Sequence, residues 1–385
     1  MTPVASPHGT GRRSLTGWLA RQGSDPRRER LFRLAFGGAF SRREGTKVLV
    51  LYESNRIAFS QVYPFLMYAR AFAAHHDAQF RLLPTDAALK GLPRAHLEAT
   101  HVIAQVWGID HPERLEAVRA RLQELPAGVQ RIYLDGFANA DIRFARRLPE
   151  FRLYYKKSLL SPRTELLRPR YGHTNLTEYY GRLYGIAQEP TDWQVPPDML
   201  PRLRLAPNFL TAPDLAGSFL GAPPPQDGRR DIDVNARIGG TRMDSWYGAM
   251  RRDAEARATA LQGLRVTTGS GLTRERFMAE LSRSRICFSP FGYGEICWRD
   301  IEAFATGSVL LKPDMSHIDT EPDLYRDDET YVALKWDFSD FEEKVRTLLA
   351  DDARRDRIAR TAWQTARRYL EQNGPVTAYS DIFAA

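Results

Sequence analysis

The sequence predicts an α/β protein of two domains, each with a parallel β-sheet, that face each other across a cleft. Short β-rich runs alternate with amphipathic helical stretches along most of the 385 residues, and one proline-rich stretch interrupts this alternation. Such alternation is typical of right-handed βαβ units. The length suits two domains, and seven Trp, 19 Phe and 16 Tyr supply large side chains for their cores.

The first domain is expected over residues 46–189. Its β-rich runs, which we expect to be strands, lie at residues 48–51, 80–83, 101–106, 130–135 and 151–155. Helical patterns lie between them, at residues 62–75 and 112–125.

Nine of the 24 prolines lie between Pro190 and Pro225. Because proline lacks an N–H and has a fixed φ, we expect neither a regular helix nor a central strand here. We therefore assign residues 190–229 to a proline-rich linker and residues 230–385 to the second domain. Strands are expected there at residues 231–238, 264–268, 285–289, 309–311 and 331–334, and helices at 245–261, 274–282, 299–306, 340–350 and 352–371.

The positive charge is concentrated at the N-terminus. The formal net charge is +8, and the first 43 residues contain nine Arg against Asp25 and Glu29, which leaves the remainder nearly neutral. Residues 1–45 are either a basic amphipathic tail that lies on an anionic membrane surface or a short helix packed on the body. The neutral remainder argues against a nucleic-acid partner.

The cysteine and hydropathy patterns favour a cytoplasmic protein. Two cysteines, Cys287 and Cys297, do not make a disulfide framework, and the eight His show no zinc-site spacing. No stretch is long and apolar enough for a membrane span or a signal peptide. We expect the cytoplasm, with attachment to the inner membrane face through the tail as an alternative.

The densest functional signal lies in residues 287–313. An apolar strand runs into a turn containing Gly292, Tyr293 and Gly294, and the helix that follows ends near Gly307. Glycine lets the backbone approach a ligand, and a helix N-terminus presents unpaired N–H groups. This combination predicts a phosphate site.

Two glutamates accompany this turn. Glu295 stands at its end and Glu302 in the helix, so both lie roughly on one helical face. Such a pair can accept hydrogen bonds from sugar hydroxyls. The alternative is a solvated helix start, where the macrodipole favours acidic residues.

The run from Ile286 to Pro313 resembles the donor-binding domain of GT-B glycosyltransferases. It has their order of strand, glycine turn, Glu295, helix with Glu302-Ala303, and apolar strand. Those enzymes often carry two glutamates with seven residues between them, and here six lie between. Arg299 is followed by the runs 307–312 and 331–334, and this order resembles the one in glycosyl transferase family 1 and CAP10-like transferases. The resemblance covers about residues 230–350.

The resemblance implies two Rossmann-like domains and sugar transfer from a nucleotide-sugar donor to a glycan or lipid-linked acceptor. By analogy, Glu302 would bind the ribose hydroxyls and Glu295 the donor sugar. The backbone of Gly292, Tyr293 and Gly294 would approach the phosphates. The nucleotide-sugar is a substrate, and no cofactor is expected.

Four cations are candidates for a phosphate clamp. A leaving nucleoside diphosphate gathers negative charge, so fixed positive groups lower the barrier. Arg237 and Lys312 stand at expected strand ends, Arg242 follows two glycines, and Arg299 begins the helix. Guanidinium groups match phosphate oxygens, although a surface salt bridge is the alternative for each Arg.

We expect metal-independent catalysis. Asp231 and Asp233 have the spacing of a divalent-cation pair, but they lie at the start of a strand, away from the expected cleft. The residues predicted to be catalytic are Glu295 and Asp135, and Asp135 is a candidate base at the end of a strand. Other candidate bases are Glu53, Asp110 and His173, and a retaining mechanism needs no such base.

Three functions are therefore compared. The first is a glycosyltransferase, for which the tyrosine-rich residues 154–184 either shape the acceptor site or pack between the domains. The second is a nucleotide-sugar epimerase of the same fold. The third is a non-enzymatic binder of lipid or nucleic acid, which rests only on the basic tail.

Overall fold

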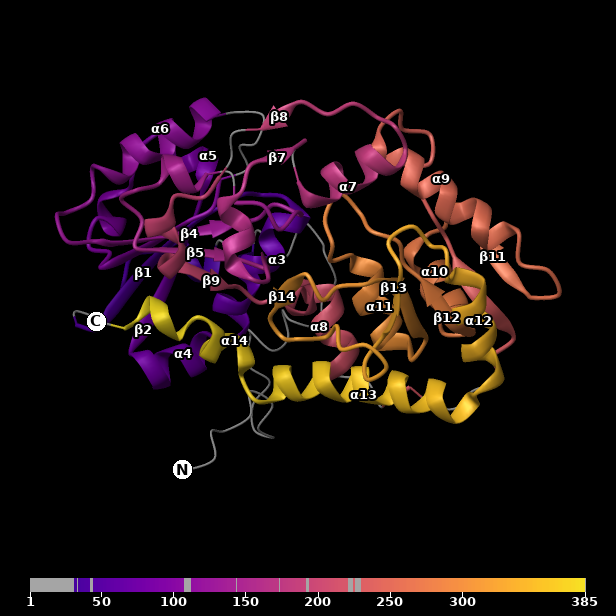
Figure 1. The fold of residues 1–385 in the computed structure, drawn as a ribbon. Coiled ribbons are helices and arrows are strands. Elements are labelled where there is room, and N and C mark those ends of the chain that lie inside the picture. The colour runs from indigo at the N-terminus through magenta and orange to yellow at the C-terminus, as the bar shows by residue number, and fades with distance from the viewer. Residues whose placement is uncertain are drawn as a thin grey trace.

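A computed structural model gives the fold of the chain (Figure 1). It describes residues 31–384 except for residues 33, 42–43, 107–111, 143, 173, 192–193, 221–223 and 226–229. Two parallel sheets with helices around them form two α/β domains, which confirms the predicted fold class.

The sheet of the first domain has the strand order β2-β1-β3-β4-β5-β9, and every neighbouring pair is parallel. Its strands are β1 (Thr46–Tyr52), β2 (Ala78–Pro84), β3 (His101–Ala104), β4 (Gln130–Asp135), β5 (Leu153–Lys156) and β9 (Leu203–Leu205). Helices between them are α3 (Arg56–Met67), α4 (Ala69–His76), α5 (Thr85–Ala88) and α6 (Pro112–Leu122). The five predicted strands are confirmed, and their apolar residues are buried.

The sheet of the second domain has the order β11-β10-β12-β13-β15, again all parallel. Its strands are β10 (Ile232–Ala236), β11 (Val266–Thr268), β12 (Ser284–Phe288), β13 (Val309–Pro313) and β15 (Val332–Leu334). Its helices are α9 (Trp246–Thr259), α10 (Arg274–Leu281), α11 (Trp298–Thr306), α12 (Phe341–Ala350) and α13 (Asp352–Glu371). All five predicted strands and all five predicted helices are confirmed.

The proline-rich stretch holds more regular structure than expected. β9 adds an edge strand to the first sheet, and α8 (Pro213–Leu220) packs on α11 and α13. The expectation of no regular helix was wrong because Pro213 is the first residue of α8, where a missing N–H costs nothing.

The C-terminus returns to the first domain. In Figure 1, α13 runs from the second domain toward the first and is followed by α14 (Gly374–Ala378). Tyr379 packs against Phe65 with ring centroids 4.5 Å apart, and Tyr68 donates a hydrogen bond of 2.8 Å to the Leu370 carbonyl. Residues after 373 thus complete the core of the first domain.

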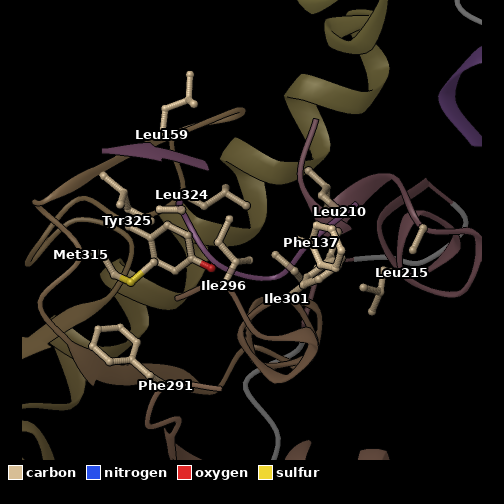
Figure 2. Close-up of a cluster of buried hydrophobic side chains, with 14 of the residues drawn as sticks. Phe137, Leu159, Leu210, Leu215, Phe291, Ile296, Ile301, Met315, Leu324 and Tyr325 are labelled. Carbon is tan, nitrogen blue, oxygen red and sulfur yellow. The ribbon is translucent and has the colours of Figure 1, made fainter. Parts of the chain in front are cut away.

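The two domains share a small sheet and a hydrophobic core. Strand β6 (Ser158–Leu160) pairs antiparallel with β14 (Ile318–Thr320), and a second two-stranded sheet joins β7 (Arg170–Tyr171) and β8 (Pro190–Thr191). Figure 2 shows Phe137 of the first domain in one buried cluster with Ile296 and Ile301 of the second. Helix α7 (Asn175–Leu183) packs on α9 at the same junction.

The described part of the basic tail packs on the first domain. Phe32 is buried and lies 5.8 Å from the ring of Tyr63, and Phe40 packs near His96. This favours the alternative of a segment packed on the body for residues 31–41, while residues 1–30 lie outside the described residues. Among the described helices, none has the length and apolar character needed to cross a membrane.

Candidate functional site

A cavity of about 380 Å³ lies at the carboxyl edge of the second sheet. It is formed by residues that follow β10 and β11 and by helices α9, α10 and α11. The lining residues are Arg237, Gly239, Arg251, Ser270, Gly271, Leu272, Phe277, Cys297, Trp298, Arg299 and Glu302. The structure therefore brings together three of the sequence-predicted donor residues: Arg237, Arg299 and Glu302.

Three arginines give the cavity a positive wall. Arg251 of α9 is only 6% exposed, and one guanidinium N–H donates to the Phe291 carbonyl at 2.8 Å. Arg299 donates to the carbonyl of Arg237. Within the described residues, Nε of Arg251 and Nε of Arg299 are buried and have no hydrogen-bond partner. Because buried N–H groups are normally paired, these two unpartnered donors make the cavity a candidate ligand site.

Arg237 is held in place by a carboxylate behind the cavity. Its Nε and Nη2 donate to the two oxygens of Glu280 at 2.9 and 2.7 Å. Hydrogen bonding to Glu280 raises the pKa of Arg237, and the same contact lowers the pKa of Glu280. Burial lowers the pKa of Arg251. In this wall, Glu280 partly balances the charge of Arg237, whereas burial removes Arg251 from water.

Glu302 is the one acidic side chain among the lining residues. It stands in α11 and accepts a hydrogen bond of 2.5 Å from Arg274 on Oε1. No hydrogen bond to its Oε2 is present among the described residues. The carboxylate can therefore accept a hydrogen bond from a ligand while Arg274 fixes its orientation.

Gly294 of the glycine turn faces the other domain rather than this cavity. A side chain at Gly294 would clash with the backbone carbonyl of Ala138, which follows β4 of the first sheet. Gly292 lies beside Cys297, and Tyr293 is 49% exposed and stacks on Tyr247 at 4.3 Å. The close backbone approach that Gly294 permits is thus an approach of one domain to the other.

An internal carboxylate occupies the start of α11. Asp300 accepts from the Cys297 N–H at 2.9 Å and from the Ser289 hydroxyl at 2.6 Å. Lys312 is fully buried, and its Nζ lies 3.2 Å from Asp300 Oδ2. Lys312 therefore faces Asp300 and is not among the residues that line the cavity.

Asp135 is buried and fully engaged. Its Oδ2 lies 3.0 Å from Nζ of the equally buried Lys156 and accepts from the Tyr154 hydroxyl, while Oδ1 accepts from the Phe137 N–H at 2.8 Å. These contacts fix the loop that meets Gly294. Of the other candidate bases, Glu53 pairs with Arg114 at 2.9 Å, and Asp110 and His173 lie outside the described residues.

Glu295 has a different environment. It is fully buried at the domain junction, and in the described part of the chain neither carboxylate oxygen accepts a hydrogen bond. Nε2 of His317 lies 3.7 Å from Oε1 of Glu295. Burial and the adjacent Lys156 lower the pKa of Lys157 to about 7, and Glu295 acts on it in the opposite direction. An unsatisfied buried carboxylate is costly in a stable fold and is typical of a functional position.

The remaining predicted groups lie away from the cavity. Arg242 is exposed and does not line it. Asp231 pairs with Arg283, and Asp233 pairs with Arg285, at the start of β10. Within the described residues, no group of three or more His, Cys, Asp or Glu is arranged to hold a metal ion.

Sequence reasoning missed three parts of this region. Arg251 lies inside a helix, where no strand-end signal marks it. Ser270 and Gly271 follow β11 and were detectable by the rule that ligands bind at the carboxyl ends of parallel strands. His317 reaches Glu295 only through β14, which the sequence pattern did not predict.

Comparison with known proteins supports the fold and the second domain. Residues 228–373 match a family model described as glycosyl transferase-like. An alpha-glucosyltransferase solved with UDP and a 13-mer DNA is similar in structure, with a TM-score of 0.50 and 10% identity over 89% of this chain and 100% of that chain. A glycosyltransferase from Rickettsia africae has a TM-score of 0.46 and 9% identity over 88% and 98%.

An epimerase-type structure is also among the similar structures, with a lower TM-score than the alpha-glucosyltransferase. The UDP-N-acetylglucosamine 2-epimerase structure from Listeria monocytogenes has a TM-score of 0.45 and 10% identity over 88% and 96% of the two chains. A search of curated proteins found no match. At these identities the likeness concerns the fold, and it confirms the predicted GT-B arrangement of two Rossmann-like domains.

Proposed function

We propose that this chain, in which residues 228–373 form a glycosyl transferase-like domain within a GT-B fold, transfers a sugar from a nucleotide-sugar donor to an acceptor hydroxyl. The observation that carries the proposal is the cavity that joins Arg237, Arg251 and Arg299 to Glu302. Positive groups for a diphosphate and a carboxylate for ribose hydroxyls stand in one pocket.

Each part of a nucleotide has a matching set of residues. The diphosphate lies against Arg251 and Arg299, whose Nε groups have no hydrogen-bond partner in the described structure. The ribose lies at Glu302, and the base lies in the pocket of Ser270 to Leu272 and Phe277. The volume of about 380 Å³ is within the range of small-molecule sites.

The donor sugar is assigned to the Glu295 side of the site. Glu295 is two residues from Cys297, which lines the cavity, and its oxygens have no hydrogen-bond donors among the described residues. In the reaction, the bond between the anomeric carbon and the diphosphate oxygen breaks, and its electron pair leaves with the nucleotide. A bond to the acceptor oxygen forms, and the hydroxyl proton is released. The arginines stabilise the charge of the leaving diphosphate.

The other predicted residues receive positioning roles in this proposal. Lys312 holds Asp300 at the start of α11, and Asp135 holds the loop that packs against Gly294. The stacked Tyr293 and the exposed Arg242 lie outside the pocket. The DNA in the similar alpha-glucosyltransferase structure belongs to that protein, and the absence of a nucleic-acid partner stays a prediction for this chain.

A nucleotide panel tests the proposal. UDP, GDP, ADP and dTDP are added to the full chain, and the thermal midpoint is measured. We expect one of them to stabilise the protein, by about 2.7 kcal/mol at a hundred times its Kd. Absence of any shift with all four nucleotides would contradict the proposal. Labelled nucleotide-sugar without acceptor then separates the alternatives, since an epimerase releases an isomerised sugar.

A further inference from the structure

A second cavity, of about 770 Å³, lies where α7 of the first domain meets the segment around β14 and β15 of the second. Its walls come from both domains, so neither domain forms it alone. The lining residues are Leu160, Ser161, Pro162, Glu165, Arg168, Arg170, Asn175, Glu178, Tyr179, Arg182, Leu183, His317 and Trp336.

Buried polar groups without partners line this cavity. Asn175, the first residue of α7, is 8% exposed, and neither its amide oxygen nor its amide nitrogen makes a hydrogen bond within the described residues. Neither ring nitrogen of His317 makes a hydrogen bond within the described residues. An amide and an imidazole offer donors and acceptors together, which matches hydroxyl groups better than a simple ion.

Aromatic side chains form one wall. Tyr179 is 37% exposed, and its ring meets Trp336 with centroids 4.9 Å apart. Trp336 also contacts His317 at 4.7 Å. Flat apolar rings beside a few polar groups are typical of sites for amphipathic ligands such as sugars, whose C–H faces pack on rings.

A charged network also lines this cavity. Glu178 accepts hydrogen bonds from Arg182 at 2.8 Å, from Arg170 at 3.4 Å and from Arg168 at 3.5 Å. Arg168 also donates to Glu165 at 2.7 Å. These side chains hold one another in fixed orientations, so they present a preorganised polar surface rather than a free patch of charge.

His317 connects this cavity to the proposed donor site. It lines the second cavity, and its Nε2 lies 3.7 Å from Glu295 Oε1. Glu295 is in turn two residues from Cys297, which lines the first cavity. The short segment from Glu295 to Cys297 therefore separates the two cavities.

We propose that the second cavity binds a carbohydrate acceptor, with one or two sugar rings on Tyr179 and Trp336 and hydroxyl groups at Asn175 and His317. This inference rests on the proposed glycosyl transfer and specifies its acceptor as a glycan end. A lipid chain would leave Asn175 and His317 without partners, and a duplex is too large for a cavity of about 770 Å³.

Saturation-transfer NMR on the full chain tests the inference with maltose, cellobiose and lactose as probes. We expect at least one disaccharide to bind, and Tyr179→Ala and Asn175→Ala to weaken its affinity about tenfold, which corresponds to about 1.4 kcal/mol. Tyr171→Ala is the matched control, because Tyr171 is 51% exposed close by but does not line the cavity. Its affinity should equal that of the unaltered protein.

The outcomes separate this inference from the proposed function. Nucleotide thermal shifts are measured on the same samples. If a nucleotide binds but no disaccharide does, or if both variants bind the sugar normally, the acceptor site is wrong while the donor site stands. Binding of dodecyl phosphate or a 13-mer duplex that Tyr179→Ala abolishes would overturn the carbohydrate assignment. Failure of every nucleotide would instead remove the proposed function.

Discussion

Glu302 offers the sharpest test of the donor site. Its Oε1 accepts from Arg274 at 2.5 Å, so one oxygen of the carboxylate is held and the other can meet a ribose hydroxyl. Glu302→Gln keeps the size and the hydrogen bond to Arg274 if the amide oxygen takes the Oε1 position. The variant then replaces one charged acceptor with an N–H₂ group.

The expected loss follows from that single contact. Hydrogen bonds to charged groups contribute about 1.5–3 kcal/mol, so nucleotide affinity should fall roughly 10- to 150-fold. Isothermal titration calorimetry measures this with the nucleoside diphosphate that gives the largest thermal shift. Arg274→Met is the companion variant, because Arg274 touches Glu302 but does not line the cavity, and it should weaken affinity less.

A 2′-deoxy nucleotide identifies the contact. If Glu302 binds the ribose, the unaltered protein should prefer the ribonucleotide over its 2′-deoxy or 3′-deoxy form, and this preference should shrink in Glu302→Gln. If the unaltered protein and Glu302→Gln prefer the ribonucleotide over each deoxy form to the same degree, the assignment of Glu302 to the ribose is refuted, even if the affinity falls.

Three further results are expected. Arg251→Lys should weaken nucleotide binding at least about tenfold because Lys lacks the planar guanidinium fork of Arg. Arg252→Lys on the same helix should leave nucleotide binding unchanged, since Arg252 donates to the Thr241 and Met243 carbonyls outside the cavity. Equal calorimetric Kd values for the two variants would contradict the assignment of Arg251 to the nucleotide site. Transfer should continue in EDTA because arginines supply the positive charge, and a complete loss of product would show a metal requirement. The pKa of Lys157 is about 7 in the folded protein against 10.5 when unfolded, so the unfolded state binds more protons between these pH values. The free energy of unfolding should therefore rise with pH in this range, by at most about 1.4 kcal/mol per pH unit. In denaturant titrations, Lys157→Met should show a smaller rise of this free energy with pH, and an unchanged rise would exclude Lys157 as its cause.

The strands and helices around the site were predictable because they follow local periodicity. β4 (Gln130–Asp135) and α13 (Asp352–Glu371) have the predicted bounds, since each has a regular apolar pattern with clear ends. β9 and α8 were not predicted, because the count of prolines hides that Pro213 occupies a helix start, where proline is tolerated.

The site was predictable only in part for a related reason. Arg237 follows a strand end, and Arg299 and Glu302 lie in the helix after the glycine turn, and such positions are visible in a single sequence. Arg251 and His317 reach their places through the packing of α9 and the pairing of β14 with β6, which are long-range contacts. The glycine turn shows the limit of local reasoning, since a residue that permits close approach does not reveal what approaches, and here it is Ala138.

Lys312 is either a structural cation or a residue that binds the phosphate, and its substitution can separate these two roles. It is fully buried, lies 3.2 Å from Asp300 and contacts the Phe291 ring at 5.1 Å, so its removal leaves a buried carboxylate without its cation. Lys312→Met should therefore lower the free energy of unfolding by roughly 3–5 kcal/mol, measured by denaturant titration. The exposed Lys335→Met should have little effect.

Nucleotide affinity decides between the two roles of Lys312. If Lys312 acts by holding Asp300 and the start of α11, the folded variant at low temperature should keep its nucleotide Kd within about threefold, a change of less than 1 kcal/mol. If it belongs to the phosphate clamp, the affinity should fall by more than tenfold while stability changes little. The second pattern would mean that Lys312 reaches the ligand, and the positive wall would then include a fourth cation.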